Sequence, residues 1–228
     1  VCEVLKETKN SRFIPRDFEL PIGLSEGAVA PYRLTLPDGS AVLISGIADR
    51  VDVYPGADGT SYIKIVDYKS GSKTFKLSDI EEGNNLQLFM YVISLCEDAR
   101  GRYENPKPAA LIYMTTTAKE ISLNEIRDEA EIQSLAVKGI ERKGIVLDND
   151  DVRSAFGEDI RTLKAEFKNE EEMNALFESV KEVIRKETAE MKSGVVKANP
   201  KNTGGAVRCR YCPYKPVCRI ENTTEKPY

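Results

Sequence analysis

Runs of apolar residues in the first half of the chain predict strands that pair with one another. Residues 41–54 and 60–70 are rich in β-branched residues, and the Pro, Gly and Asp of residues 55–59 favour a tight reversal between them. We therefore expect an antiparallel hairpin. Residues 108–117 form a further apolar run after a proline-containing loop, which predicts a third strand.

Two other segments have the pattern of helices. Residues 84–101 are apolar on nearly every side, so we expect a helix packed on the sheet with Gly101 at its end. In residues 169–194, Asn169 and Glu172 have the spacing of a capping box, and Gly194 marks the expected stop. Apolar residues recur there at helical spacing: Met173, Leu176, Phe177, Val180, Val183, Ile184 and Met191.

The remaining segments have weaker patterns. Residues 3–10 resemble the end of a helix, and residues 11–24 an extended lead-in. Residues 118–168 are mixed, and residues 195–228 form a cysteine-rich tail with little periodicity. Strands and helices in one chain indicate an α/β fold, with a mixed central sheet flanked by helices.

Length and composition fit one globular domain, which we assign to residues 1–228. The chain has 228 residues, 41% hydrophobic and 31% charged. No apolar run approaches the roughly 18 residues of a membrane span, and no export signal begins the sequence, so we expect a cytoplasmic protein without membrane contact. Because the chain starts at Val1 without a methionine, we interpret it as a fragment of a longer protein.

The absence of histidine narrows the possible chemistry. It excludes Ser/His/Asp triads, Cys/His dyads and histidine general bases. The net charge of −4 argues against non-specific coating of nucleic acid, but residues 185–219 hold nine Lys or Arg against two Glu. This segment is either a phosphate-facing surface or a solvated basic tail.

Charges interrupt the apolar pattern of the predicted hairpin. Alternation places Asp67 and Lys69 on the same face as Ile63 and Ile65. Asp49 likewise interrupts an apolar row on the preceding strand, and the hairpin would bring it beside Asp67. Buried charges are unfavourable unless they are paired or bind a metal, so this strand end is a candidate functional site.

Two clustered carboxylates suit Mg²⁺ or Mn²⁺, which bind few protein oxygens and keep several waters. Lys69 could orient a water or stabilise charge that develops on phosphorus. Metal-assisted phosphodiester hydrolysis is one interpretation. The other is a buried ion pair without catalysis, between Asp67 and Lys69 or between Asp49 and Arg50.

Three motifs in order resemble those of PD-(D/E)xK nucleases of the RecB-like branch. They are Gly46-x-x-Asp49-Arg50-x-Asp52, Asp67-Tyr68-Lys69-Ser70-Gly71 and Gln87-x-x-x-Tyr91. The resemblance implies that Asp49 and Asp67 bind the metal, that Tyr68 lends a backbone carbonyl and that Lys69 is the catalytic lysine. Gln87 and Tyr91, one helical turn apart, match the helix motif that contacts substrate in the family.

The resemblance covers nearly the whole chain, which is similar to the nuclease domain found in AddAB-type helicase-nucleases, on their B-type subunit. It implies a restriction-endonuclease-like core, Mg²⁺-dependent exonuclease activity on DNA, end processing in double-strand break repair and recombination, and an A-type helicase/nuclease subunit as partner. Many relatives carry an upstream histidine that this chain lacks. Glu19 is an acidic candidate there, with a structural role the simpler interpretation.

Cys209, Cys212 and Cys218 have a CxxCx5C spacing that suits zinc or an iron–sulfur cluster. The resemblance favours a [4Fe-4S] cluster, whose fourth ligand in the family lies far upstream. Cys2 lacks the family's sequence context, so we expect the fourth ligand to precede Val1 and the cluster to be absent from this fragment.

Two other functions compete with a nuclease. A catalytically inactive DNA-binding or assembly module could retain the same fold, and an iron–sulfur electron-transfer protein could use the cysteines. The first would bind DNA without hydrolysis, and the second would show redox cycling with a partner. Cys96, in the apolar helix, is predicted to be a core residue.

Overall fold

The computed structural model describes residues 2–24, 29–70, 77–97, 101–116, 140–195, 202–203, 206–207 and 212–218. Its centre is a six-stranded sheet in the order β1-β4-β5-β6-β7-β8. The strands are β1 (Ile14–Ile22), β4 (Gly46–Pro55), β5 (Ser61–Lys69), β6 (Pro106–Thr115), β7 (Arg142–Leu147) and β8 (Lys164–Lys168). The β5–β6 and β7–β8 pairs are parallel and the other pairs antiparallel, which confirms the mixed sheet.

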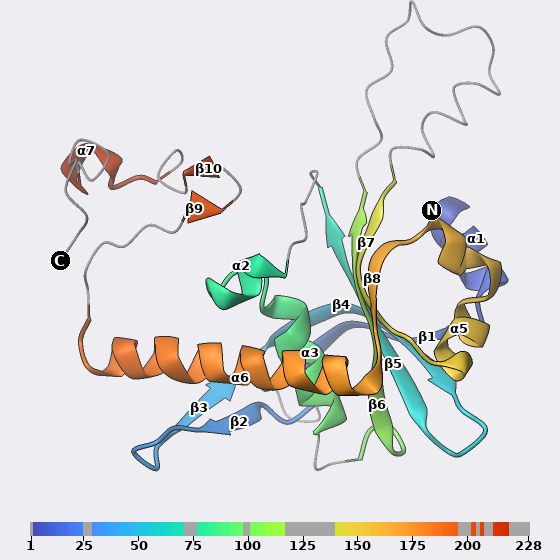
Figure 1. Ribbon diagram of the computed structural model, residues 1–228, viewed down its shortest axis with the longest axis horizontal. Coiled ribbons are helices and arrows are strands. Elements are labelled where there is room, and N and C mark those ends of the chain that lie inside the picture. Colours follow the sequence, from blue (N-terminus) through green and yellow to red (C-terminus); the bar gives the residue numbers. More distant parts are fainter. Residues whose placement is uncertain are drawn as a thin grey trace, which may run out of the picture.

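Helices cover both faces of this sheet. Figure 1 shows α3 and α6 on one side and α1 and α5 on the other. The helices are α1 (Cys2–Asn10), α2 (Ser78–Glu81), α3 (Gln87–Cys96), α5 (Asp150–Phe156), the 3-10 helix η2 (Gly157–Thr162), α6 (Glu170–Lys192) and α7 (Lys215–Cys218). In the part of the chain that the structure describes, none of the helices combines the length and the apolar character needed to cross a membrane.

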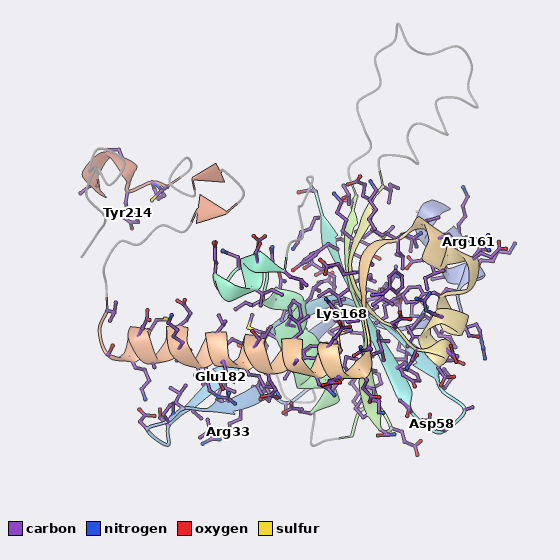
Figure 2. All side chains as sticks on the ribbon, in the orientation of Figure 1. Arg33, Asp58, Arg161, Lys168, Glu182 and Tyr214 are labelled. Carbon is purple, nitrogen blue, oxygen red and sulfur yellow. The ribbon has the colours of Figure 1, made fainter. Side chains whose placement is uncertain are left out.

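The predicted hairpin is present as β4 and β5. Its turn is closed by a hydrogen bond from the Gly56 N–H to the Thr60 carbonyl, and Gly59 has a φ of 81° that favours glycine. Figure 2 labels Asp58 in this turn. The strand predicted over 41–54, however, is divided at Ser45.

The first part of that predicted strand belongs to a separate small sheet. There β3 (Ala41–Ile44) pairs antiparallel with β2 (Tyr32–Thr35). Only the second part, β4, joins the central sheet. The apolar run hid this break because both pieces bury residues such as Ile44 and Val51. Two further short strands, β9 (Asn202–Thr203) and β10 (Ala206–Val207), pair with each other.

Helix α3 is shorter than the predicted 84–101. Asn85 has a φ of 58°, which is not helical, and the helix begins at Gln87. It ends at Cys96, with Glu97 as the C-cap, so Gly101 does not terminate it. The helix nevertheless packs on the sheet as expected.

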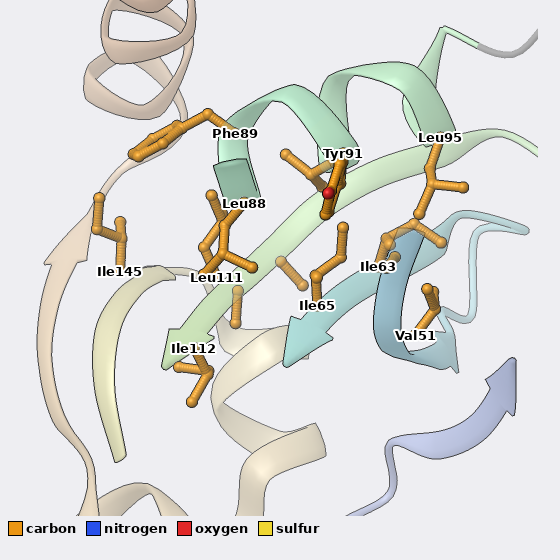
Figure 3. Packing of buried hydrophobic residues seen from close by; sticks show 14 of the residues in the cluster. Val51, Ile63, Ile65, Leu88, Phe89, Tyr91, Leu95, Leu111, Ile112 and Ile145 are labelled. Atoms are coloured by element: carbon orange, nitrogen blue, oxygen red, sulfur yellow. The ribbon is translucent and has the colours of Figure 1, made fainter. Parts of the chain in front are cut away.

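The main apolar core lies between α3 and the central strands. Figure 3 shows Leu88 and Leu95 of α3 facing Ile63 and Ile65 of β5 and Leu111 of β6. All of these side chains are at most 1% exposed. Burial of aliphatic side chains of this size contributes about 1.5–3 kcal/mol each relative to exposure. The packing therefore fixes α3 over the strand that carries Asp67.

Helix α6 begins with the predicted capping box. The Asn169 side chain accepts from the Glu172 N–H, and the Glu172 carboxylate accepts from the Asn169 N–H. Its apolar stripe buries Met173, Phe177, Val180 and Ile184. Met191, which we expected in the stripe, is 76% exposed because the last turns extend beyond the core.

The region predicted as mixed contains regular structure from residue 140 onward. It supplies β7, α5, η2 and β8, with Asn149 as the N-cap of α5. The short β8 has charged residues at alternate positions and gave no clear apolar signal. Residues 117–139 lie outside the described part of the chain.

Candidate active site

The pairing of β4 and β5 stops beside the predicted site. Their register runs from Pro55↔Ser61 to Arg50↔Val66. Asp49 and Asp67 are the next residues on the two strands, so the fold makes them neighbours. The Asp49 Oδ2 atom accepts a hydrogen bond from the Tyr68 backbone N–H at 2.8 Å. A side-chain contact thus continues the connection between the strands where the paired register ends.

Asp67 lies within the core and beside Lys69, as the alternation predicts. Its side chain is 3% exposed, and its Oδ2 atom is 2.5 Å from the Lys69 Nζ atom, whose side chain is 28% exposed. Tyr113 is the register partner of Asp67 on β6, and its hydroxyl donates to the Asn85 carbonyl just before α3. Burial, and then the charge of Asp67, raise the pKa of Tyr113 above its usual value.

The two residues of the helix motif lie together on α3. The Gln87 Nε2 atom donates to the Tyr91 hydroxyl at 3.3 Å. Tyr91 also lies against Gly46, at the start of the strand that carries Asp49. A β-carbon on Gly46 would come within 2.5 Å of the tyrosine hydroxyl oxygen. The structure thus places this pair beside β4, and their predicted contact with substrate stays a prediction.

Glu19 is exposed on β1, the edge strand next to β4. The register of these strands passes from Phe18↔Arg50 to Leu20↔Ala48, so Glu19 is level with Asp49. Its φ of 48° is rare for a residue with a β-carbon. The position along the sheet is compatible with both roles considered for Glu19, so its assignment stays a prediction.

A ring of buried charges, which the sequence did not lead us to predict, lies on the face of the sheet that α1 covers. It consists of Glu7 from α1, Arg50 and Asp52 from β4, and Lys64 from β5. Each acid lies 2.8–3.0 Å from both bases. All four side chains are at most 4% exposed, so the ring compensates two buried cations with two buried anions.

The charges in this ring stabilise one another. Burial alone would raise the pKa of Glu7, but the charges of Lys64 and Arg50 outweigh it and lower the pKa to about 2. Arg50 also donates from Nη1 to the Tyr68 hydroxyl at 2.9 Å. Of the two ion pairs considered from the sequence, the Asp67–Lys69 pair is present, whereas Arg50 binds Asp52 and Glu7.

Three members of this ring are visible in the sequence as charged residues within apolar strands. Arg50, Asp52 and Lys64 alternate with apolar residues, but the predicted site rests on the charges of Asp49, Asp67 and Lys69. The strand β5 is buried on both faces from Tyr62 to Asp67, so a charged side chain on either face needs an opposite charge beside it. Glu7 was not predictable because its helix is distant in sequence.

The donor chemistry at the end of β4 and β5 fits a hard divalent cation. Asp49 and Asp67 offer carboxylate oxygens on adjacent strands, and Mg²⁺ is commonly held by one or two carboxylates together with waters. Within the described ranges, no group of three or more His, Cys, Asp or Glu side chains gathers as a metal site.

The cysteine predictions fall mostly on residues that are not described. Cys209 lies outside the described part, and nothing is described of the Cys2 and Cys218 side chains. Cys212 is described and half-buried. Cys96 packs against the core as predicted, and burial raises the pKa of its thiol to about 12.

Residues 1–219 match the family described as the PD-(D/E)XK nuclease superfamily. A relative from Clostridium acetobutylicum, named as the B-type subunit of an ATP-dependent helicase/deoxyribonuclease, is 31% identical over 236 residues, which cover 96% of this chain and 20% of the relative. Proteins of the same name from Alkaliphilus oremlandii and Clostridioides difficile are 30% and 27% identical, over 94% and 96% of this chain.

The chain spans about a fifth of the length of the curated relatives that it matches. The family match extends over the sheet, the helices that flank it and the strand ends with Asp49 and Asp67. A mixed sheet flanked by helices is consistent with that family's fold. The chain belongs to the PD-(D/E)XK nuclease superfamily.

Proposed function

We propose that this chain is a metal-dependent deoxyribonuclease domain that hydrolyses phosphodiester bonds in DNA. The observation that carries the proposal is the position of Asp67, a carboxylate buried in the core, with Lys69 at 2.5 Å and Asp49 on the neighbouring strand, one residue beyond the last β4–β5 pair. A strand end with this concentration of charge is costly to fold unless the charges have a function or compensate one another.

Asp49, Asp67 and the backbone carbonyl of Tyr68 are the groups that would hold Mg²⁺ or Mn²⁺. When bound, such an ion supplies Lewis-acid polarisation of the scissile phosphodiester. Lys69, which is partly exposed, would orient the attacking water and stabilise negative charge that develops on the phosphate. Gln87 and Tyr91 would position the nucleic acid from α3.

A second function is favoured by one observation. The short Lys69–Asp67 ion pair satisfies both charges without an ion, which is what a catalytically inactive DNA-binding or assembly module would need. Such a module would bind DNA and leave it uncleaved in either Mg²⁺ or Mn²⁺.

The test compares Asp67→Asn with a control in the same hairpin. Asp58 lies in the exposed turn at the opposite end, so Asp58→Asn changes one carboxylate away from the site. We expect Asp67→Asn to abolish cleavage of labelled single-stranded DNA in Mg²⁺ while its circular dichroism spectrum is retained, and Asp58→Asn to cleave normally. Cleavage by Asp67→Asn at the wild-type rate contradicts the assignment.

The wider role is inferred from the relatives' printed name. By extension from those helicase/deoxyribonuclease subunits, we propose that the chain processes DNA ends in double-strand break repair and recombination, in the cytoplasm, with an A-type helicase/nuclease subunit. Co-purification of the full-length protein with such a subunit, and exonuclease activity of the complex, would test this. A full-length protein that degrades DNA alone and binds no helicase subunit would contradict it.

The cysteine tail supports a separate proposal for the full-length protein. Cys209, Cys212 and Cys218 would supply three ligands of a [4Fe-4S] cluster. Anaerobically purified full-length protein should contain about four iron atoms per chain and be brown. Colourless protein that contains zinc instead would overturn the cluster.

A further inference from the structure

Tyr68 is hydrogen-bonded through both its backbone and its side chain to consecutive residues of β4 at the candidate site. Its backbone N–H donates to the Asp49 carboxylate at 2.8 Å, and its hydroxyl accepts from the Arg50 guanidinium at 2.9 Å. Asp49 and Arg50 are consecutive on β4, and Tyr68 follows Asp67 on β5. The side chains of Arg50 and Asp49 thus link β4 to Tyr68 at the last pair of the register, Arg50↔Val66, and one residue beyond it.

These links matter because the paired register stops before the two aspartates. Main-chain hydrogen bonds of a ladder hold strands at a set spacing, and beyond the last β4–β5 pair the bond from the Tyr68 N–H to the Asp49 carboxylate joins these two strands instead. A divalent ion requires its oxygen ligands within a narrow range of distance, which for Mg²⁺ is about 2.0–2.1 Å. A small shift of one strand end would thus separate the donors.

Arg50 is well suited to hold Tyr68 in place. It is fully buried, and its other nitrogens donate to Asp52 at 2.9 and 2.8 Å and to Glu7 at 3.0 Å. A guanidinium engaged on three sides has little freedom, so the Tyr68 hydroxyl is bound to a rigid donor. Through Glu7, that rigidity depends on the docking of α1 against the sheet.

We propose that Arg50 is a positioning residue of the nuclease site, and that it acts through the Tyr68 hydroxyl to hold Asp49 and Asp67 at a separation that binds a divalent ion. The proposal rests on the function inferred above. It assigns no contact between Arg50 and substrate. The ring of buried charges, which explains why Arg50 can be buried, thereby also sets the geometry on the opposite face of the hairpin.

Tyr68→Phe isolates this link because it removes the hydroxyl and keeps the ring and the backbone. Tyr62→Phe is the matched control, since Tyr62 lies on the same strand and face of β5, and its hydroxyl contacts Asn149 and Asp151 at the far end. Three measurements apply to both variants: the Mn²⁺ dissociation constant by isothermal titration, amide hydrogen exchange at residue 68 by NMR without metal, and the kcat of DNA cleavage at saturating Mn²⁺.

We expect Tyr68→Phe to raise the Mn²⁺ dissociation constant roughly ten- to hundredfold, the range found when groups that support metal ligands are removed. We also expect faster exchange of the residue 68 amide, because its bond to Asp49 is held less firmly. The kcat at saturating Mn²⁺ should fall less than the affinity does. Tyr62→Phe should match the wild-type protein in all three values.

Asp67→Asn separates failure of this inference from failure of the proposed function. If the wild-type protein binds Mn²⁺ and Asp67→Asn does not, while Tyr68→Phe has wild-type affinity and exchange, the positioning role is wrong and the metal site stands. If wild-type protein and Asp67→Asn bind Mn²⁺ equally weakly, the proposed metal site is wrong, and the metal-positioning role falls with it.

Discussion

Gly46 lies so close to Tyr91 that a β-carbon at residue 46 would be 2.5 Å from the tyrosine hydroxyl oxygen and 2.6 Å from a ring carbon. A β-carbon essentially never lies within 3.0 Å of a non-bonded heavy atom, so one partner would have to move. The missing side chain of Gly46 thus allows α3 to approach the strand that carries Asp49. The glycine of the first motif and the tyrosine of the third motif are complementary in space.

Gly46→Ala should therefore lower both stability and DNA cleavage, since Tyr91 would be displaced together with its bond to Gln87. We expect a loss of about 1–3 kcal/mol in the free energy of unfolding, typical of overpacking. Urea titration and a cleavage assay measure the two effects.

Tyr91→Ala provides the control for this contact. With the ring removed, the Gly46→Ala change should cost almost nothing further, so the double variant should be about as stable as Tyr91→Ala alone. Additive losses would mean that the cost of Gly46→Ala does not come from contact with the Tyr91 ring.

The pKa of Glu7 predicts a specific loss of stability in acid. Because its pKa falls from 4.5 to about 2 on folding, its contribution is fully present above pH 4.5 and is lost as the pH falls toward 2. The shift corresponds to about 3 kcal/mol at neutral pH. Unfolding curves of wild-type protein and Glu7→Gln measure this contribution between about pH 6 and pH 2, the range in which carboxylic acids titrate.

Glu7→Gln should be the less stable protein at neutral pH, because Arg50 and Lys64 keep their charges and face only Asp52 in the ring. Its disadvantage should shrink as the pH falls through this window. Lys9→Gln, an exposed change on the same helix, should follow the wild-type curve. A constant difference between wild type and Glu7→Gln would contradict the lowered pKa.

Lys69→Met should separate metal binding from catalysis. The lysine neutralises Asp67 in the structure, so its removal should leave Mn²⁺ affinity unchanged or higher. Cleavage should nevertheless fall by about 10²–10³, the effect of removing one group that stabilises transition-state charge. Single-turnover cleavage at saturating Mn²⁺ measures it, and Lys69→Arg should recover part of the rate. Full activity of Lys69→Met would exclude the catalytic role.

Gly144→Ala tests the packing of β7 against β6. A β-carbon there would be 1.8 Å from the Leu111 carbonyl oxygen, and backbone cannot move aside cheaply. We expect a loss of about 4 kcal/mol or more, measured by denaturant unfolding or by failure to obtain folded protein. In Gly39→Ala, the new β-carbon meets no atom within 4 Å, and the φ of 79° should cost only about 1–2 kcal/mol. Similar losses for both would show that strand packing tolerates the clash.

The sequence predicted those features that local pattern controls. The hairpin of β4 and β5 followed from its turn chemistry, and α6 followed from its capping box and its spacing of Met173 and Phe177. The neighbouring positions of Asp49 and Asp67 followed from the hairpin alone. These features depend on contacts between residues close in sequence.

Features that depend on distant contacts were missed. Nothing local to Glu7 indicates that it enters a ring with Arg50 and Lys64, and the break at Ser45 depends on the partners of β3 and β4. The predicted start of α3 was wrong because nothing in the pattern of apolar residues marks the positive φ of Asn85. The alternation along β5 predicts one core face, whereas this strand is buried on both faces.

The ring around Arg50 has a practical consequence for anyone who shortens this chain. A trimmed version that lacks the first ten residues would look conservative, since it spares every strand. It would nonetheless expose the face of the sheet that α1 covers. Arg50 and Lys64 would then share the single carboxylate of Asp52, because Glu7 would be gone. The first helix is thus an integral part of the folded core, and expression boundaries should retain it.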